Sequence, residues 1–240
     1  MASQRMVGLA AVCALVASGA AAQTPDAMSP AQIAVACAPP PIIAAVPADA
    51  TRIIGSQDAV ARNLFGTPEL LVISGGTERG LQLGQQYFIR RVPRSAEDYR
   101  DNVPHQVRTS GWVRVVAVNA TTTIVNVEHA CADILVGDYL DPFQTPALPE
   151  QDITSVDTTR EPDFASYGRV LYGSEERRSG GIGEFMLIDR GTDQSVALGA
   201  PLASIGEATV VSIGPKMSVV RINRARDAIY SGDLAVPRSK

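Results

Sequence analysis

The chain has 240 residues, of which 45% are hydrophobic and 5% aromatic, and its formal net charge is −4 at pH 7. A mildly acidic chain with scattered lysines and arginines lacks the basic patch of a nucleic-acid-binding protein, so we expect no nucleic-acid partner. The apolar content excludes a disordered chain and indicates a globular protein with an aliphatic core.

The first 22 residues have the pattern of a secretory signal peptide. Arg5 is the only charged residue there, residues 6–17 are mostly apolar, and Ala22 ends a run of small residues. We expect cleavage near Ala22 and a periplasmic or secreted mature protein without a transmembrane segment. Lipidation at Cys13 is the alternative, but Val12 is bulky where that processing requires a small residue.

Residues 23–50 form a leader rich in Ala and Pro, with three consecutive prolines from Pro39. This composition favours polyproline-like extension and cannot pair as a central strand, so we expect a tether or loosely packed arm. Cys37 and Cys131 are the two cysteines that remain after signal removal. In an oxidising compartment they could form one disulfide, and two unpaired thiols are the alternative.

The remainder of the chain is internally duplicated. Residues 69–84 (ELLVISGGTERGLQLG) align without a gap on residues 184–199 (EFMLIDRGTDQSVALG), and residues 111–142 align on 206–237. An opening strand precedes each copy, and we align Ile53 of the first with Leu171 of the second. A duplicated unit therefore accounts for most of the protein.

Two tandem modules are predicted, at residues 51–142 and 167–237, with a polar, proline-containing linker at 143–166. Each module consists of short apolar or β-branched runs separated by turns, including a hairpin around Asn119. Strands this short and evenly spaced favour a small barrel or sandwich over a βαβ unit. The predicted fold is all-β, with two tandem repeats of a small β-barrel or sandwich-like module and little helix.

Matching turn residues are the clearest feature that the copies share. Gly76 and Gly191 each follow a buried strand, where glycine permits a positive φ or close approach of another backbone segment. Asp138 and Asp233 each follow a glycine. We expect their carboxylates to cap backbone amides in the turn rather than to act as metal ligands or acids.

The pattern I-[SD]-x-G-T-x-x-x-[LV]-x-L-G occurs at residues 73–84 and 188–199, and each copy continues with an apolar hairpin and I-x-x-G-D. This combination resembles a β-module of bacterial envelope proteins. It is similar to the C-terminal domain of flagellar assembly protein T and to domains that follow LysM motifs in some secreted proteins. The resemblance covers both repeats and implies an envelope-associated module without catalytic chemistry.

Patterns that indicate chemistry are scarce. The two histidines, His105 and His129, have no Gly-x-Ser-x-Gly elbow with which to build a catalytic triad. The thiols and imidazoles are widely scattered along the sequence, without the close ligand spacing of zinc sites. The glycine-rich residues 179–183 lack the Lys-Ser/Thr of a phosphate-binding loop and precede a predicted strand. We therefore expect no catalytic residue, no cofactor and no metal.

The first module contains a charged excursion, in or near residues 92–110, that the second lacks. Long loops on a compact scaffold often carry binding residues, and a tolerated surface insertion is the alternative. The arginines beside it could receive an acidic partner or a glycan carboxylate, or could pair with Glu97 and Asp98. The interaction candidates are Arg90, Arg91, Arg94, Tyr99 and His105.

These patterns together predict an exported, non-enzymatic cell-envelope protein that makes protein–protein or cell-wall contacts through its β-surface and the 92–110 loop. The expected partner is an envelope protein or a cell-wall component. The alternative is an envelope hydrolase or inhibitory domain with a site between the two modules.

Overall fold

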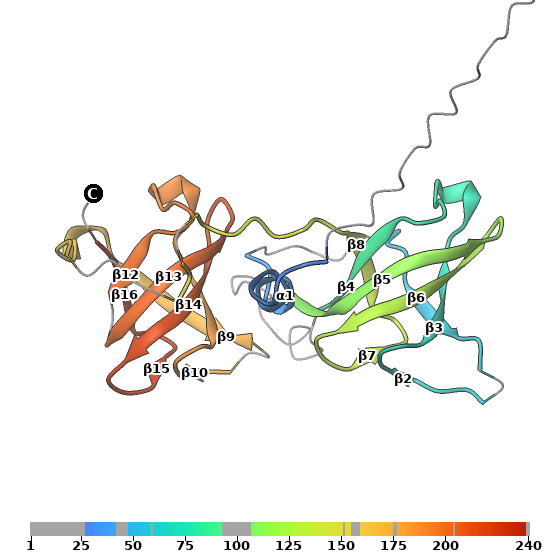
Figure 1. Ribbon diagram of the computed structural model, residues 1–240, viewed down its shortest axis with the longest axis horizontal. Coiled ribbons are helices and arrows are strands. Elements are labelled where there is room, and N and C mark those ends of the chain that lie inside the picture. Colours follow the sequence, from blue (N-terminus) through green and yellow to red (C-terminus); the bar gives the residue numbers. More distant parts are fainter. Residues whose placement is uncertain are drawn as a thin grey trace, which may run out of the picture.

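The described part of the chain contains two β-modules with a short helix between them (Figure 1). A computed structural model describes residues 27–41, 48–58, 60–92, 107–150, 152–154, 159–174, 177–203 and 205–238. The fold is all-β with two modules, as the sequence predicts. The predicted signal peptide lies outside the described residues. Within the described part of the chain, no helix is long and apolar enough to cross a membrane.

The first module is a six-stranded antiparallel sheet in the order β1-β3-β6-β5-β4-β8. An isolated bridge between Arg52 and Tyr139 joins the two edge strands, so the sheet curls almost into a barrel. Two short strands, β2 and β7, pair separately at one end. The strands are β1 (Ile53–Ser56), β2 (Leu64–Phe65), β3 (Leu70–Ser74), β4 (Gln86–Arg91), β5 (Arg108–Val118), β6 (Thr122–Ala130), β7 (Ile134–Leu135) and β8 (Tyr139–Pro142).

The second module is a closed barrel with the same strand order, β9-β11-β14-β13-β12-β16, in which β9 takes the place of β1. Its short pair β10–β15 corresponds to β2–β7. The duplication in the sequence is therefore a duplication of fold. The strands are β9 (Gly168–Gly173), β10 (Ser179–Gly180), β11 (Phe185–Ile188), β12 (Pro201–Ala203), β13 (Gly206–Ile213), β14 (Ser218–Ala225), β15 (Ile229–Tyr230) and β16 (Leu234–Pro237).

The register of the opening strands corrects the alignment of Ile53 with Leu171. Ile53 pairs with Ile73, and Val170 pairs with the equivalent Ile188. Ile53 therefore corresponds to Val170, one residue earlier than the sequence alignment. Both strands contain a bulge, at which the register with the partner strand shifts.

The shared turn residues have the structural roles that we expect from the sequence. The backbone N–H of Leu135 donates to Asp138 Oδ2 at 2.9 Å, and that of Tyr230 donates to Asp233 Oδ2 at 2.7 Å. A Cβ on Gly76 would lie 2.0 Å from the carbonyl oxygen of Asn119. Close approach of another backbone segment, rather than a positive φ, therefore requires the glycine there.

The leader contains α1 (Pro30–Cys37), which corrects the expectation of a loosely packed extended arm. Ser29 begins the helix with a capping box. The N–H of Gln32 donates to Ser29 Oγ at 3.2 Å, and the N–H of Ser29 donates to Gln32 Oε1 at 2.8 Å. Pro30 fits the first turn because its missing N–H would have no partner there. The proline run starts at Pro39, after the helix has ended.

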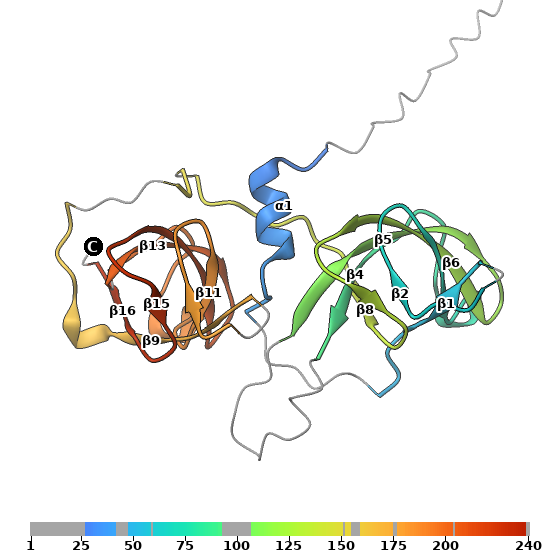
Figure 2. The ribbon, with the colours of Figure 1, turned by 90° about the horizontal axis from the view of Figure 1, so that it is seen from below.

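Helix α1 lies between the two modules, as two perpendicular views show (Figures 1 and 2). Ala36 packs with Phe88 and Trp112 of the first module. Val35 packs with Leu187 and Val219 of the second. These contacts are separate from the aliphatic cores that fill the two barrels. The helix therefore joins the outer faces of two independently filled modules.

Candidate functional site

A pocket of 280 Å³ lies where α1 meets both modules. Ala34 and Cys37 of α1 form one wall, Arg108 and Thr109 of β5 form another, and Phe185 at the start of β11 contributes from the second module. The location between modules matches the place that the hydrolase alternative requires. Among the described residues that line this pocket, none is a histidine or an acid.

A disulfide between Cys37 and Cys131 ties the end of α1 to the end of β6. The two Cα atoms are 5.4 Å apart, although the residues are separated by 94 positions in the sequence. This is one of the two alternatives that the sequence left open. Because both cysteines line the pocket, the bond is part of its wall.

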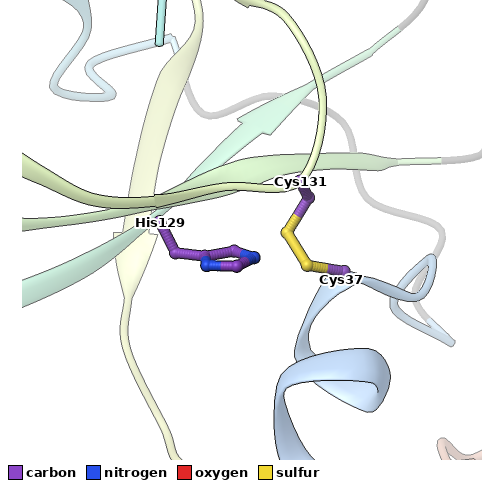
Figure 3. Close-up of side chains that lie close together, drawn as sticks. All are labelled: Cys37, His129 and Cys131. Carbon is purple, nitrogen blue, oxygen red and sulfur yellow. A yellow bond between two sulfur atoms is a disulfide. The ribbon is translucent and has the colours of Figure 1, made fainter. Parts of the chain in front are cut away.

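His129 lies beside this disulfide (Figure 3). Its imidazole stacks on the indole of Trp112, with ring centroids 4.5 Å apart and an interplanar angle of 16°. One ligand atom from each of Cys37, His129 and Cys131 lies within 4.8 Å of the others. Cys37 is far from the other two residues in the sequence, but all three side chains are adjacent in the fold. The expectation that they are scattered is therefore wrong for the three-dimensional structure.

Arg90 is enclosed by its own module. The residue is 7% exposed, and its guanidinium lies 4.1 Å from the ring centroid of Phe88. Arg90 Nη1 donates to Thr109 Oγ1, and Arg90 Nε lies 3.7 Å from a carboxylate oxygen of Asp141. Burial lowers the pKa of Arg90, and the carboxylate of Asp141 partly offsets that effect. Arg90 is therefore not available to an acidic partner, contrary to expectation.

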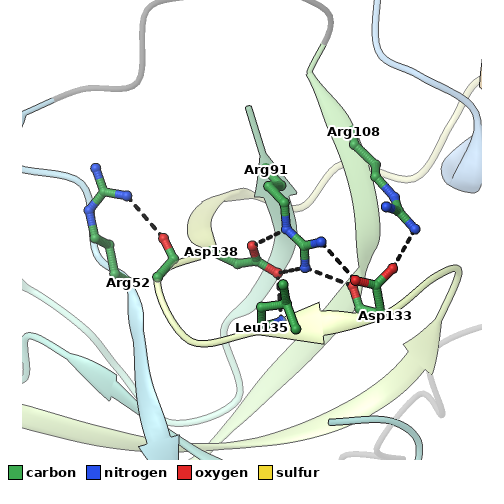
Figure 4. A network of polar contacts seen from close by, with 7 residues as sticks. Arg52, Arg91, Arg108, Asp133, Leu135 and Asp138 are labelled. Atoms are coloured by element: carbon green, nitrogen blue, oxygen red, sulfur yellow. Dashed lines mark hydrogen bonds and ion pairs between the residues drawn. The ribbon is translucent and has the colours of Figure 1, made fainter. Parts of the chain in front are cut away.

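Arg91 is held by two carboxylates of the same module (Figure 4). Its Nε and Nη2 donate to the two oxygens of Asp138 at 2.6 and 2.7 Å, and its Nη1 donates to Asp133 Oδ2 at 2.8 Å. The hydrogen bond to Asp138 is the main cause of a raised pKa for Arg91. This arginine therefore has internal acidic partners among the described residues, whereas Glu97 and Asp98, which the sequence offered as alternative partners, lie outside them.

The same network fixes the strand that follows the loop. Arg108 Nη2 donates to Asp133 Oδ1 at 2.6 Å, so one carboxylate holds both Arg91 and Arg108 (Figure 4). The hydrogen bond from Arg91, followed by the charge of Arg108, lowers the pKa of Asp133. Arg91 and Arg108 also face each other as a pair in the β4–β5 ladder. The two ends of the loop are thus held together at the pocket.

The remaining loop candidates, Arg94, Tyr99 and His105, lie outside the described residues. What the structure places is the start and the end of the loop: residues 92–107 connect β4 to β5 at the pocket. In the second module only residues 204–205 connect the equivalent strands β12 and β13. The sequence identified this difference in length. It did not show that the end of the connection at Arg108 lies beside α1, because that depends on contacts between distant segments.

No protein-family model matches this chain, and no curated protein matches it.

Proposed function

We propose that the protein is an exported, non-enzymatic cell-envelope protein that binds a protein or cell-wall partner at the junction between its modules. Export is supported by the signal-peptide pattern of residues 1–22. An envelope role is supported by the resemblance of both repeats to β-modules of bacterial envelope proteins. Neither module needs a cofactor to fold in this proposal, because each barrel has its own aliphatic core.

The position of the two ends of the 92–107 connection is the observation that carries the proposal. The two modules share strand order and turns, yet only the first one extends this connection. The loop begins after Arg91 and ends before Arg108. These two arginines pair in the β4–β5 ladder, and Arg108 lines the inter-module pocket. Rigid scaffolds with variable loops are a common arrangement for binding sites. The loop, rather than Arg90 and Arg91, is therefore the element that would contact a partner.

The hydrolase or inhibitory alternative receives less support. A nucleophile needs a nearby base, and the described residues that line the pocket include hydroxyl groups but no imidazole or carboxylate. Thr109 Oγ1 is already engaged, since it donates to the carbonyl of Ala38 at 3.2 Å. An activity of the purified protein that disappears in His105→Ala or His129→Ala would favour this alternative.

Cross-linking in the native envelope tests the binding proposal. The variant deletes residues 93–106, so that Val92 and Val107 form a two-residue connection, the length found at 204–205, between the paired residues Arg91 and Arg108. We expect the wild-type chain to capture a recurring partner and the shortened chain to lose it while keeping its circular dichroism spectrum and melting temperature.

A chain in which residues 93–106 are scrambled controls for loop length and charge. Loss of the partner in this variant as well would show that the order of the loop residues matters. Two outcomes contradict the proposal: a wild-type protein that is found free with no recurring partner, or a shortened chain that captures the same partner as the wild type.

A further inference from the structure

Three side chains that commonly bind metal ions converge at the end of α1. The sulfur atoms of Cys37 and Cys131 and a ring nitrogen of His129 all lie within 4.8 Å of one another. His129 lies near the end of β6, and Cys131 directly follows the last residue of that strand, Ala130. Cys37 reaches them from the helix. Figure 3 shows a nitrogen of the imidazole directed at the two sulfur atoms.

The imidazole is held in this orientation by aromatic packing. It stacks on Trp112, which is 4% exposed. Trp112 in turn contacts Phe88 and Phe143, with ring centroids 6.5 and 5.7 Å away. A ligand that is already oriented loses little conformational freedom on binding. The aromatic cluster therefore holds the imidazole of His129 in an orientation from which it can bind an ion near the two sulfur atoms.

We propose that reduction of the Cys37–Cys131 disulfide converts this cluster into a binding site for one thiophilic metal ion of the Zn²⁺ type. A dithiol reductant supplies two electrons and two protons. The bond between the sulfur atoms breaks, two thiols form, and the reductant becomes a disulfide. Zn²⁺ then displaces the two thiol protons to solvent and binds two thiolates and one neutral imidazole.

The local geometry accommodates such an ion. Tetrahedral zinc with bonds of about 2.3 Å to sulfur places two thiolates roughly 3.8 Å apart. Rotation of the two cysteine side chains supplies this separation without moving α1. Both cysteines line the 280 Å³ pocket, which leaves room for water or another small ligand at the fourth position. None of the three side chains is fully buried, so an ion can enter from solvent.

The metal would replace one cross-link by another. In the oxidised chain a covalent bond fixes α1 to the first module. In the reduced chain the shared ion would bind ligands from the same two elements. Helix α1 would then stay between the modules in both redox states, while the wall of the pocket changes from a disulfide to a metal centre in which two thiolates balance the charge of the ion.

Metal binding by the reduced full chain tests this inference. A phosphine reductant under anaerobic conditions opens the disulfide without chelating the metal, and a chromophoric chelator competes for Zn²⁺. We expect one Zn²⁺ per reduced chain, none in the oxidised chain, and an affinity weaker by about tenfold or more in His129→Ala. Co²⁺ in place of Zn²⁺ should give thiolate-to-cobalt charge-transfer absorption.

Two variants serve as controls. Arg224→Ala changes the position in β14 of the other module that corresponds to His129, outside the Cys37–His129–Cys131 cluster, and should leave the affinity unchanged. A chain with both Cys37→Ser and Cys131→Ser should not bind. The inference is overturned if this double variant or His129→Ala binds Zn²⁺ as tightly as the reduced wild type. It is equally overturned if the reduced wild type loses its β-sheet circular dichroism and binds no better than His129→Ala.

Discussion

Asp138 and Asp233 occupy the same turn of the two modules but have different partners. Both accept a hydrogen bond from a backbone amide of that turn. Asp138 is also paired with Arg91 through both carboxylate oxygens and is 4% exposed. A comparison of the two aspartates therefore distinguishes the stability that comes from a turn cap from the stability that comes from a buried ion pair.

We expect Asp138→Ala to lower the free energy of unfolding by about 3 kcal/mol, because it leaves the guanidinium of Arg91 with one carboxylate fewer in a poorly solvated site. Asp233→Ala should lower it by about 1 kcal/mol, since it removes one charge-assisted hydrogen bond at a more exposed turn. Denaturant unfolding of the full chain measures both. Equal losses in the two variants would contradict the assigned difference.

At the residue scale, the sequence predicted the turn caps and missed the ion pairs. The Gly-Asp pattern recurs at equivalent places, and its local hydrogen bond spans three residues, so the pattern alone identifies it. The pair between Arg91 and Asp138 spans 47 residues. Its formation depends on strand order, which local sequence patterns do not reveal.

Corresponding turns in the two modules show which glycines are needed. The short helical turns η1 (Thr77–Arg79) and η5 (Thr192–Gln194) follow Gly76 and Gly191, and each ends in a left-handed residue. That residue is Gly80 in the first module, with φ of 77°, and a serine in the second, with φ of 61°. The left-handed position at the end of the turn therefore accepts a side chain. At the position before the turn, Gly76 or Gly191, backbone atoms leave no space for a Cβ.

Gly76→Ala should destabilise the chain by about 3 kcal/mol, because its Cβ would lie 2.0 Å from the carbonyl oxygen of Asn119 and the hairpin would have to shift. Gly80→Ala should cost about 1 kcal/mol, since there is open space around its Cβ and only the left-handed conformation is strained. Thermal unfolding of the two variants makes the comparison. A larger effect at Gly80 would refute the close-approach argument.

At the element scale, strands were easier to predict than the helix. Repeated β-branched runs and turns identified the modules, although the sequence alignment placed the two opening strands one residue out of register with each other. Helix α1 has eight residues, too few for a clear periodic pattern. Its capping box and first-turn proline are visible in the sequence, but the neighbouring proline run favoured an extended arm.

For the whole molecule, α1 is the joint between the modules. Val35 is 7% exposed and packs with apolar side chains of the second module, while the disulfide holds the helix on the first. Val35→Asp should remove about 2 kcal/mol of apolar burial and place a charge in that contact. We expect the modules to separate while each barrel stays folded, which small-angle X-ray scattering would detect as a larger radius of gyration.

Gln82→Asp introduces the same charge at an exposed position and controls for electrostatic expansion. If Val35→Asp has the radius of gyration of this control, α1 does not hold the modules together. The sequence did not predict this joint, because the two barrels can be recognised one at a time from local patterns. The contacts between them involve a leader that neither repeat contains.

The place of α1 in the chain has a consequence for the order of assembly. The helix precedes both modules in the sequence, but its partners include Cys131 in the first and Val219 in the second. During synthesis, its contacts must therefore wait for strands that are made later, even if each module folds as soon as it is complete. Among the described elements α1 is made first, yet it can dock only after strands of both modules exist, and an oxidant that acts too soon would meet Cys37 before Cys131 is made.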